Sequence, residues 1–166
     1  VHSAPIRVRD RALLLSIIQD VTERDEAQRE LAEEAEERRQ LLAALGEGVY
    51  GADINGICTF INQAALDALG FRQEEVLGRD QHALFHHHRP DGGDYPAEEC
   101  PISRTLRDGQ RRELEEWFFR RDGEGFPVEL IVTPRWEGGR RVGAVVVFRD
   151  STEQRRQRAA VQQLLA

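Results

Sequence analysis

The stretch VYGADINGICTFINQAALDALG, residues Val49–Gly70, contains two short apolar runs followed by a helix-forming segment. Asn55-Gly56 separates the two runs, and this dipeptide suits the positive φ angles of a two-residue β-turn. The second run stops at Asn62, a favoured helix N-cap, and the helix-forming segment stops at Gly70, a typical helix C-cap. The stretch therefore predicts a β-hairpin that leads directly into a short helix.

Three longer β-type runs lie nearer the end of the chain. They cover residues 112–121, 125–136 and 140–150. Asp122-Gly123 and Gly138-Gly139 separate them, and both dipeptides are typical of turns. The runs therefore predict three strands joined by tight turns.

The segment between the hairpin and these strands alternates helical and polar stretches. EEVLG predicts a helical turn, residues 82–96 predict a polar loop, and residues 97–106 predict a helix that ends at Gly109. Short strands, then helices, then long strands predict one α+β domain over residues 46–150.

Two further helices are predicted beside this domain, over residues 21–45 and 151–166. The segment Thr22–Leu45 contains no Gly or Pro and is rich in good helix formers. Its apolar residues follow the alternating steps of four and three that are typical of a coiled coil. We expect a parallel homodimer, and the alternative is a solvated linker helix. The expected dimer seam consists of Leu31, Ala35, Leu42 and Leu45, extended by Val161 and Leu165.

A short repeat links the two helical segments, because QDVTER at Gln19–Arg24 is echoed by RDSTEQ at Arg149–Gln154. Each copy follows a β-type apolar run. An Asp or Thr at such a point can accept hydrogen bonds from the first N–H groups of a helix. The repeat predicts that residues 1–20 are the final β-hairpin of an upstream domain, with strands near His2–Val8 and Arg11–Gln19. The candidate signal-relay residues at these junctions are Asp20, Thr22, Asp150 and Thr152.

Several motifs taken together resemble the PAS domain family. They are VYGADINGICTFINQAALDALGFRQEEVLGRD, RRDGEGFPVELIVTP and GAVVVFRDSTEQ, within residues 42–154. The resemblance implies a five-stranded antiparallel sheet of order 2-1-5-4-3 with small helices over one face. Residues 1–20 similarly resemble the last strands of a preceding PAS domain. Such domains commonly lie upstream of bacterial histidine kinase or diguanylate cyclase output domains. They sense a small ligand, redox state or light, or only mediate dimer contacts.

We therefore interpret the chain as a sensory and relay piece of a longer signalling protein, with its output domain beyond Ala166. The sequence contains no phosphoacceptor His box and no G-G-[DE]-E-F motif. GEGVYG at Gly46–Gly51 matches a nucleotide-loop pattern, but it follows a helix and opens a strand, the reverse of what such a loop requires. No Ser/His/Asp catalytic arrangement is present, so we expect no enzyme activity from this part of the protein.

The composition limits the partners and the compartment. The 166 residues carry a net charge of −7, which argues against nucleic-acid and anionic-membrane partners. The longest apolar runs are far shorter than the about 20 residues that span a bilayer. The two cysteines do not form a disulfide framework, so we expect a cytoplasmic protein with reduced thiols.

The only group of soft metal ligands in the sequence comprises His82, His86, His87, His88 and Cys100. Neighbouring side chains of an extended loop point to opposite sides, so we expect a solvated loop here and no metal. Cys100-Pro101 resembles a haem-thiolate dipeptide, but it also suits the start of a helix. Because a helix N-terminus lowers the pKa of a thiol, Cys100 is the candidate haem ligand or redox sensor.

If the domain binds a ligand, we expect the ligand to occupy its interior. The alternative is that packed side chains fill the interior, and the domain is then a ligand-free dimerisation scaffold. A haem- or redox-sensing domain that uses Cys100 or a histidine is the third hypothesis. No cofactor is assigned; haem and flavin stay open, although the flavin-binding stretch G-x-N-C-R-F-L-Q of light-sensing PAS domains is absent. The residues expected to face inward are Ile61, Leu66, Leu69, Leu84, Phe85, Ile102, Leu106, Phe118, Leu130, Val132, Val145 and Val147. All of these except Leu69 and Val147 are candidate pocket residues.

Overall fold

The computed structural model describes residues 11–166, with side chains described from Val21 onwards. The chain divides into two units, residues 1–41 and Leu42–Ala166. Within the described part of the chain, no helix combines the length and the apolar character that crossing a membrane requires.

The first unit is dominated by helix α1 (Arg11–Ala44). The strand predicted over Arg11–Gln19 is therefore wrong, and its expected partner His2–Val8 lies outside the described residues. Residues 11–15, RALLL, are strong helix formers, and no Gly or Pro lies between residue 11 and Gly46. A helix also closes its backbone hydrogen bonds within its own segment, whereas a hairpin edge needs a neighbouring strand.

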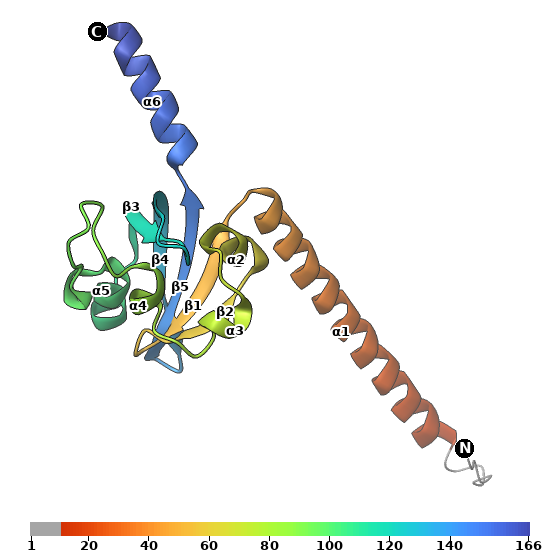
Figure 1. The fold of residues 1–166 in the computed structure, drawn as a ribbon. Coiled ribbons are helices and arrows are strands. Elements are labelled where there is room, and N and C mark those ends of the chain that lie inside the picture. The colour runs from red at the N-terminus through yellow and green to blue at the C-terminus, as the bar shows by residue number, and fades with distance from the viewer. Residues whose placement is uncertain (1–10) are drawn as a thin grey trace. The chain divides into compact units, whose positions relative to one another are not determined.

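The second unit contains a five-stranded antiparallel sheet in the order β2-β1-β5-β4-β3, as predicted. Its strands are β1 (Gly48–Asp53), β2 (Cys58–Ile61), β3 (Arg112–Phe119), β4 (Gly125–Glu137) and β5 (Arg140–Asp150). The short helices are α2 (Gln63–Leu69), α3 (Gln73–Val76), α4 (Gln81–Phe85), the 3-10 turn η1 (Ala97–Glu99) and α5 (Pro101–Asp108). They gather over one face of the sheet, and α6 (Thr152–Leu165) continues the chain after β5 (Figure 1).

The hairpin between β1 and β2 has a three-residue loop, Ile54–Gly56, in place of the predicted two-residue turn. Gly56 N–H donates to the Asp53 carbonyl at 3.0 Å, and Asp53 N–H donates to the Ile57 carbonyl at 2.9 Å. The predicted positive φ at Gly56 is confirmed at 82°, but the only positive φ angles in the described residues belong to glycines, which excludes a type I′ turn. The Asp53 carboxylate accepts the N–H groups of Asn55 and Ile57 and so stabilises the longer loop.

The predicted helix boundaries are confirmed where a cap residue marks the end of the helix. Helix α2 begins after Asn62, whose side chain accepts the Ala65 N–H, and ends at Gly70 with φ 75°, as predicted. The predicted polar loop over residues 82–96 is wrong at its start, because α4 extends to Phe85. The predicted helix over residues 97–106 is divided at Cys100 into η1 and α5.

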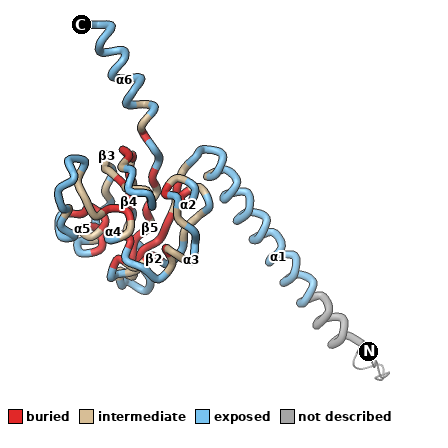
Figure 2. The backbone as a smooth tube through the Cα atoms, in the orientation of Figure 1, coloured by how far each residue is buried: buried red, intermediate tan, exposed pale blue. Residues whose placement is uncertain are grey.

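The core lies between the sheet and the short helices, where the buried residues concentrate (Figure 2). Its centre is a group of aromatic rings, with Phe118 5.5 Å from Phe85 and 5.2 Å from Phe148 between centroids, and Tyr50 5.1 Å from Phe85. Of the residues predicted to face inward, Leu66, Leu69, Phe85, Ile102, Leu106, Phe118, Leu130 and Val132 are buried, and Ile61 and Leu84 are partly buried against them.

Val145 and Val147 lie on the opposite face of the sheet from the one predicted. In β5 the buried side chains are those of Ala144, Val146 and Phe148, and the alternation of a strand places the side chains between them on the other side. The helix-covered face therefore uses the even-numbered positions of β5.

Replacing Gly56 by Val tests the loop geometry. A Cβ at Gly56 would have 3.9 Å to its nearest neighbour, Asp80 Oδ1, so the cost comes from backbone strain and not from a clash. We expect the free energy of unfolding to fall by about 1–2 kcal/mol, with a lower thermal midpoint. Gly56→Asn is the matched control and should lose less, because Asn tolerates positive φ. Equal midpoints for the two variants would contradict the loop.

Candidate functional site

Helix α4 and the start of α5 bring His82, His86 and Cys100 together. Asp80 caps α4 by accepting the His82 N–H at 2.9 Å. His86 is the C-cap residue of α4, and its backbone N–H donates to the His82 carbonyl, which leaves the two ring centroids 5.6 Å apart. Cys100 directly precedes Pro101, the first residue of α5. One ring nitrogen of each histidine and the Cys100 Sγ all lie within 4.8 Å of one another. We call these three residues the His–Cys cluster.

His86 lies at the centre of the His–Cys cluster and is completely buried. Its Nδ1 is 3.1 Å from Cys100 Sγ, and its Nε2 is 3.2 Å from Glu116 Oε2. Glu116 comes from β3 and also accepts the Tyr95 hydroxyl at 3.0 Å. A carboxylate only accepts, so His86 Nε2 carries a proton and Nδ1 faces the sulfur.

His82 is oriented by a backbone carbonyl. Its Nε2 donates to the Tyr95 carbonyl at 2.8 Å, which places a proton on that nitrogen. Its Nδ1 is buried and has no hydrogen-bond partner. The interaction with Cys100 is nevertheless the largest cause that raises the pKa of His82, so this nitrogen faces the sulfur without a hydrogen bond of ordinary geometry.

The electrostatics of the cluster favour charge separation. Burial alone would raise the pKa of the Cys100 thiol, but interactions with His82 and His86 outweigh burial and lower that pKa to about 6. Burial alone would lower the pKa of His86, but Cys100 and Glu116 raise it to about 9. The two shifts both favour an imidazolium at His86 between a Cys100 thiolate and the Glu116 carboxylate.

The pKa of Cys100 is lowered in the direction that the sequence analysis expected, but the interactions with His82 and His86 contribute more to this than the backbone hydrogen bond with Ser103 does. The other two histidines lie outside the cluster, but their rings contact each other with centroids 4.6 Å apart, so the expectation that neighbouring side chains point to opposite sides is wrong for this pair. His87 stacks on Phe119 with centroids 5.0 Å apart, and His88 lies 3.4 Å from Asp94. The sequence analysis missed the convergence of His82 and His86, and the signal available was their spacing of four after the cap residue Asp80.

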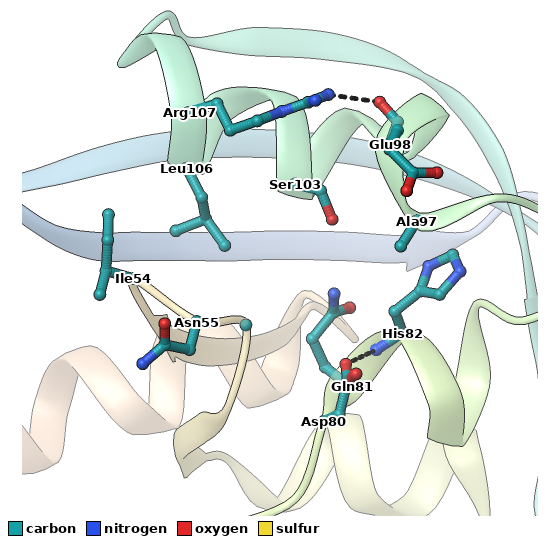
Figure 3. Close-up of a pocket in the computed structure, with 11 residues that line it drawn as sticks. Ile54, Asn55, Asp80, Gln81, His82, Ala97, Glu98, Ser103, Leu106 and Arg107 are labelled. Carbon is teal, nitrogen blue, oxygen red and sulfur yellow. Dashed lines mark hydrogen bonds between the residues drawn. The ribbon is translucent and has the colours of Figure 1, made fainter.

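A pocket of about 240 Å³ lies beside the His–Cys cluster, between the β1–β2 loop, the start of α4, and α5 (Figure 3). His82 lines it, and so does Gln81, whose Oε1 accepts the Tyr50 hydroxyl at 3.0 Å. Leu106 is the one predicted pocket residue among those that line it. Gln81 therefore joins the pocket to the aromatic centre of the core, a role that the sequence analysis did not identify.

The candidate relay and dimer residues lie away from this pocket. Asp150 Oδ1 accepts the Thr152 N–H at 2.9 Å, which is the predicted capping contact at the start of α6. Asp20 and Thr22 belong to α1, and only the backbone of Asp20 is described. The predicted seam residues Leu31, Leu45, Val161 and Leu165 are exposed, as is Ala35, and Leu42 is partly exposed.

The sheet order and the helix-covered face agree with a direct sequence match: a family model described as a PAS domain covers residues 46–153. The chain belongs to the PAS domain family. This confirms the resemblance seen in the sequence motifs. The flanking residues 11–45 lie outside the matched range.

Curated relatives of this PAS domain are signalling proteins. It is 33% identical over 113 residues to two-component system protein A of Emericella nidulans, covering 68% of this chain and 16% of that protein. The chain is 32% identical over 148 residues to the probable diguanylate cyclase DgcE of Escherichia coli, covering 86% of this chain and 13% of that protein. It is 31% identical over 125 residues to the sensor histidine kinase DcuS of Escherichia coli, covering 73% and 20%. The chain thus spans a fifth or less of each of these relatives.

Solved structures share the fold at lower identity. The PAS domain of an HTR-like protein from Haloarcula marismortui superimposes with a TM-score of 0.59 at 22% identity, covering 76% of this chain and 98% of that one. An RNA-binding light-oxygen-voltage receptor superimposes with a TM-score of 0.58 at 23% identity, covering 72% and 34%. These similarities establish the PAS fold and carry no information on a ligand.

The surroundings of Cys100 do not suit a haem thiolate. Cys100 is completely buried, and His86 Nδ1 stands 3.1 Å from its sulfur. A haem iron bound to this sulfur would have to displace His86 from its contacts with Cys100 and Glu116.

A thiolate titration tests the charge separation in the cluster. In the chelator-treated Cys58→Ser variant, the ultraviolet absorption of the Cys100 thiolate should appear with a midpoint near pH 6. In the matched Cys100→Ser variant, the Cys58 thiolate should appear only near pH 11, because burial raises the pKa of Cys58. A Cys100 midpoint at or above the ordinary value of about 8.5 would contradict the arrangement.

Proposed function

We propose that this PAS domain is a sensory and relay module of a longer signalling protein, and that it dimerises and passes a conformational change from its sheet to an output domain that follows α6. The observation that carries the proposal is the junction between β5 and α6. It ties the sheet directly to a helix whose apolar side chains are uncovered.

The junction is held by polar contacts from several elements. Asp150 accepts the Thr152 N–H with Oδ1 and receives Arg120 Nη2 on Oδ2 at 3.0 Å. Further along the helix, Arg155 and Arg158 contact Glu115 of β3 at 2.7 Å and 3.4 Å. These ion pairs are exposed, and such pairs contribute little energy each. A small movement of the sheet could therefore change them.

The remainder of α6 is uncovered. It has no buried residue, and the side chains of Val161, Leu164 and Leu165 are 54%, 85% and 83% exposed. A helix of this length is marginal alone in water. Pairing with a second copy would cover these side chains and stabilise the helix. The exposed Leu31 of α1, 67% accessible, supports pairing of the helix that precedes the PAS domain in the sequence as well.

The identity of the output domain is part of the proposal. The relatives include a histidine kinase and a probable diguanylate cyclase, and an output of one of these two classes fits the relay. We place the protein in the cytoplasm, where Cys58 and Cys100, both free thiols, would stay reduced.

A second candidate function is a dimerisation scaffold without a ligand. The packed aromatic centre of the core favours it, because Tyr50, Phe85 and Phe118 occupy the interior where a large ligand would bind. The scaffold and the relay differ in whether the rotation of α6 affects the output.

Substitution of the expected seam in α1 tests dimerisation. Leu31→Glu with Leu42→Glu should give monomers by light scattering, because buried like charges would oppose pairing. The control variant carries Glu at Ala32 and Ala43, which lie off the seam, and should stay dimeric. A wild-type protein that is already monomeric at high concentration would remove the basis for the prediction.

Insertions in α6 test the relay in the full-length parent protein. One residue inserted after Gln157 rotates the following side chains by about 100°, so Val161 and Leu165 should no longer face the partner helix and output activity should change. Seven inserted residues restore the facing side to within about 20°, and activity should recover. Activity that is indifferent to both insertions would make α6 a tether and favour the scaffold.

A further inference from the structure

The His–Cys cluster has the ligand types of a transition-metal site. Two imidazoles and one thiolate converge from α4 and from the residue before α5, within 4.8 Å. Imidazole nitrogen and thiolate sulfur are the ligands that zinc prefers in proteins. The cluster is largely enclosed, with His86 and Cys100 completely buried.

Outer hydrogen bonds orient both imidazoles as metal sites require. The Nε2 of His86 is bonded to the Glu116 carboxylate and the Nε2 of His82 to the Tyr95 carbonyl. Histidines that ligate metals usually donate their second N–H to a carboxylate or a backbone carbonyl. Both Nδ1 atoms are thereby left as the nitrogens available for a metal.

Hydrogen bonding alone leaves the cluster incomplete. Cys100 Sγ and His86 Nδ1 satisfy each other at 3.1 Å, whereas His82 Nδ1 is buried without a partner. An unpaired buried polar atom is costly. A cation would bond to all three atoms at once.

We propose that His82, His86 and Cys100 bind one divalent zinc-type ion, with Glu116 and Tyr95 as positioning residues. With neutral imidazoles, the Cys100 thiolate and the Glu116 carboxylate supply two negative charges, which a divalent cation neutralises. Tetrahedral zinc, with Zn–S about 2.3 Å and Zn–N about 2.1 Å, holds its ligand atoms about 3.3–3.6 Å apart. The present separations therefore need adjustments of roughly 1 Å.

One residue of the His–Cys cluster also borders a pocket. His82 also lines the pocket of about 240 Å³ beside the β1–β2 loop (Figure 3). Three protein ligands leave a fourth position for water or another small ligand. Metal binding does not depend on the relay proposed above, since it can be measured without any output domain.

Zinc and cobalt titrations of the 1–166 chain test the site. Zn²⁺ should bind one ion per chain by calorimetry and raise the thermal midpoint. Co²⁺ should give the visible bands of four-coordinate cobalt together with a near-ultraviolet thiolate-to-cobalt band. Cys100→Ser should abolish the thiolate band, and His82→Ala should weaken Zn²⁺ binding by more than about 100-fold. Glu116→Gln should weaken it by about 10- to 100-fold.

Matched controls separate the cluster from its neighbours. His88→Ala removes an imidazole of the same region, and Cys58→Ser removes the other thiol; both should bind Zn²⁺ like the wild type. Circular dichroism of each metal-free variant checks folding, and His82→Ala decides the outcome if Cys100→Ser does not fold, because His82 is not completely buried. A wild-type protein without the thiolate-to-cobalt band would overturn the proposal. So would His88→Ala weakening Zn²⁺ binding as much as His82→Ala.

Discussion

The antiparallel pairing of β5 with β1 on one side and β4 on the other is the constraint on which the PAS domain depends. Val146 lies opposite Tyr50 in β1 and Val132 in β4, so one buried position joins both halves of the sheet. The pairing requires a glycine at residue 143, since a Cβ there would lie 2.1 Å from the Ala52 carbonyl oxygen. Strand β3 reaches the rest of the sheet through β4, and the inward orientation of Glu116 follows from that register.

Glu116 is a carboxylate at the boundary between the apolar core and the polar His–Cys cluster. It occupies an inward position of β3 opposite Val128, where an aliphatic side chain would pack without needing partners. A buried carboxylate is tolerated only when other groups pair with it, and His86 and Tyr95 do so. The resulting chain of contacts runs from the sheet through His86 to Cys100. The domain thus combines a well-packed aromatic centre with a polar cluster at its edge.

Much of the fold was predictable because turn and cap residues act over a few positions, as Asn62 does for α2. The predictions were wrong where contacts between residues far apart in the sequence decide the structure, or where one pattern fits both a strand and a helix. Val145 stands in an uninterrupted apolar run, so no alternation marks its face and only pairing across the sheet decides it. Residues 11–19 combine helix-forming leucines with isoleucines that favour strands, so the apolar run alone does not separate the two structures. The convergence of His82 and His86 was hidden because a polar, histidine-rich segment was assumed to be extended.

The same register that builds the core also determines where the chain enters and leaves the domain. Gly48, the first residue of β1, is paired with Phe148 near the end of β5. Paired antiparallel residues stand only about 5 Å apart, so the two ends of the domain are neighbours. Excising the domain between them, or replacing it with another of the same fold, would leave a gap that a single short peptide could bridge. A unit of this kind can be lost, duplicated or exchanged between genes while the path of the surrounding chain is preserved.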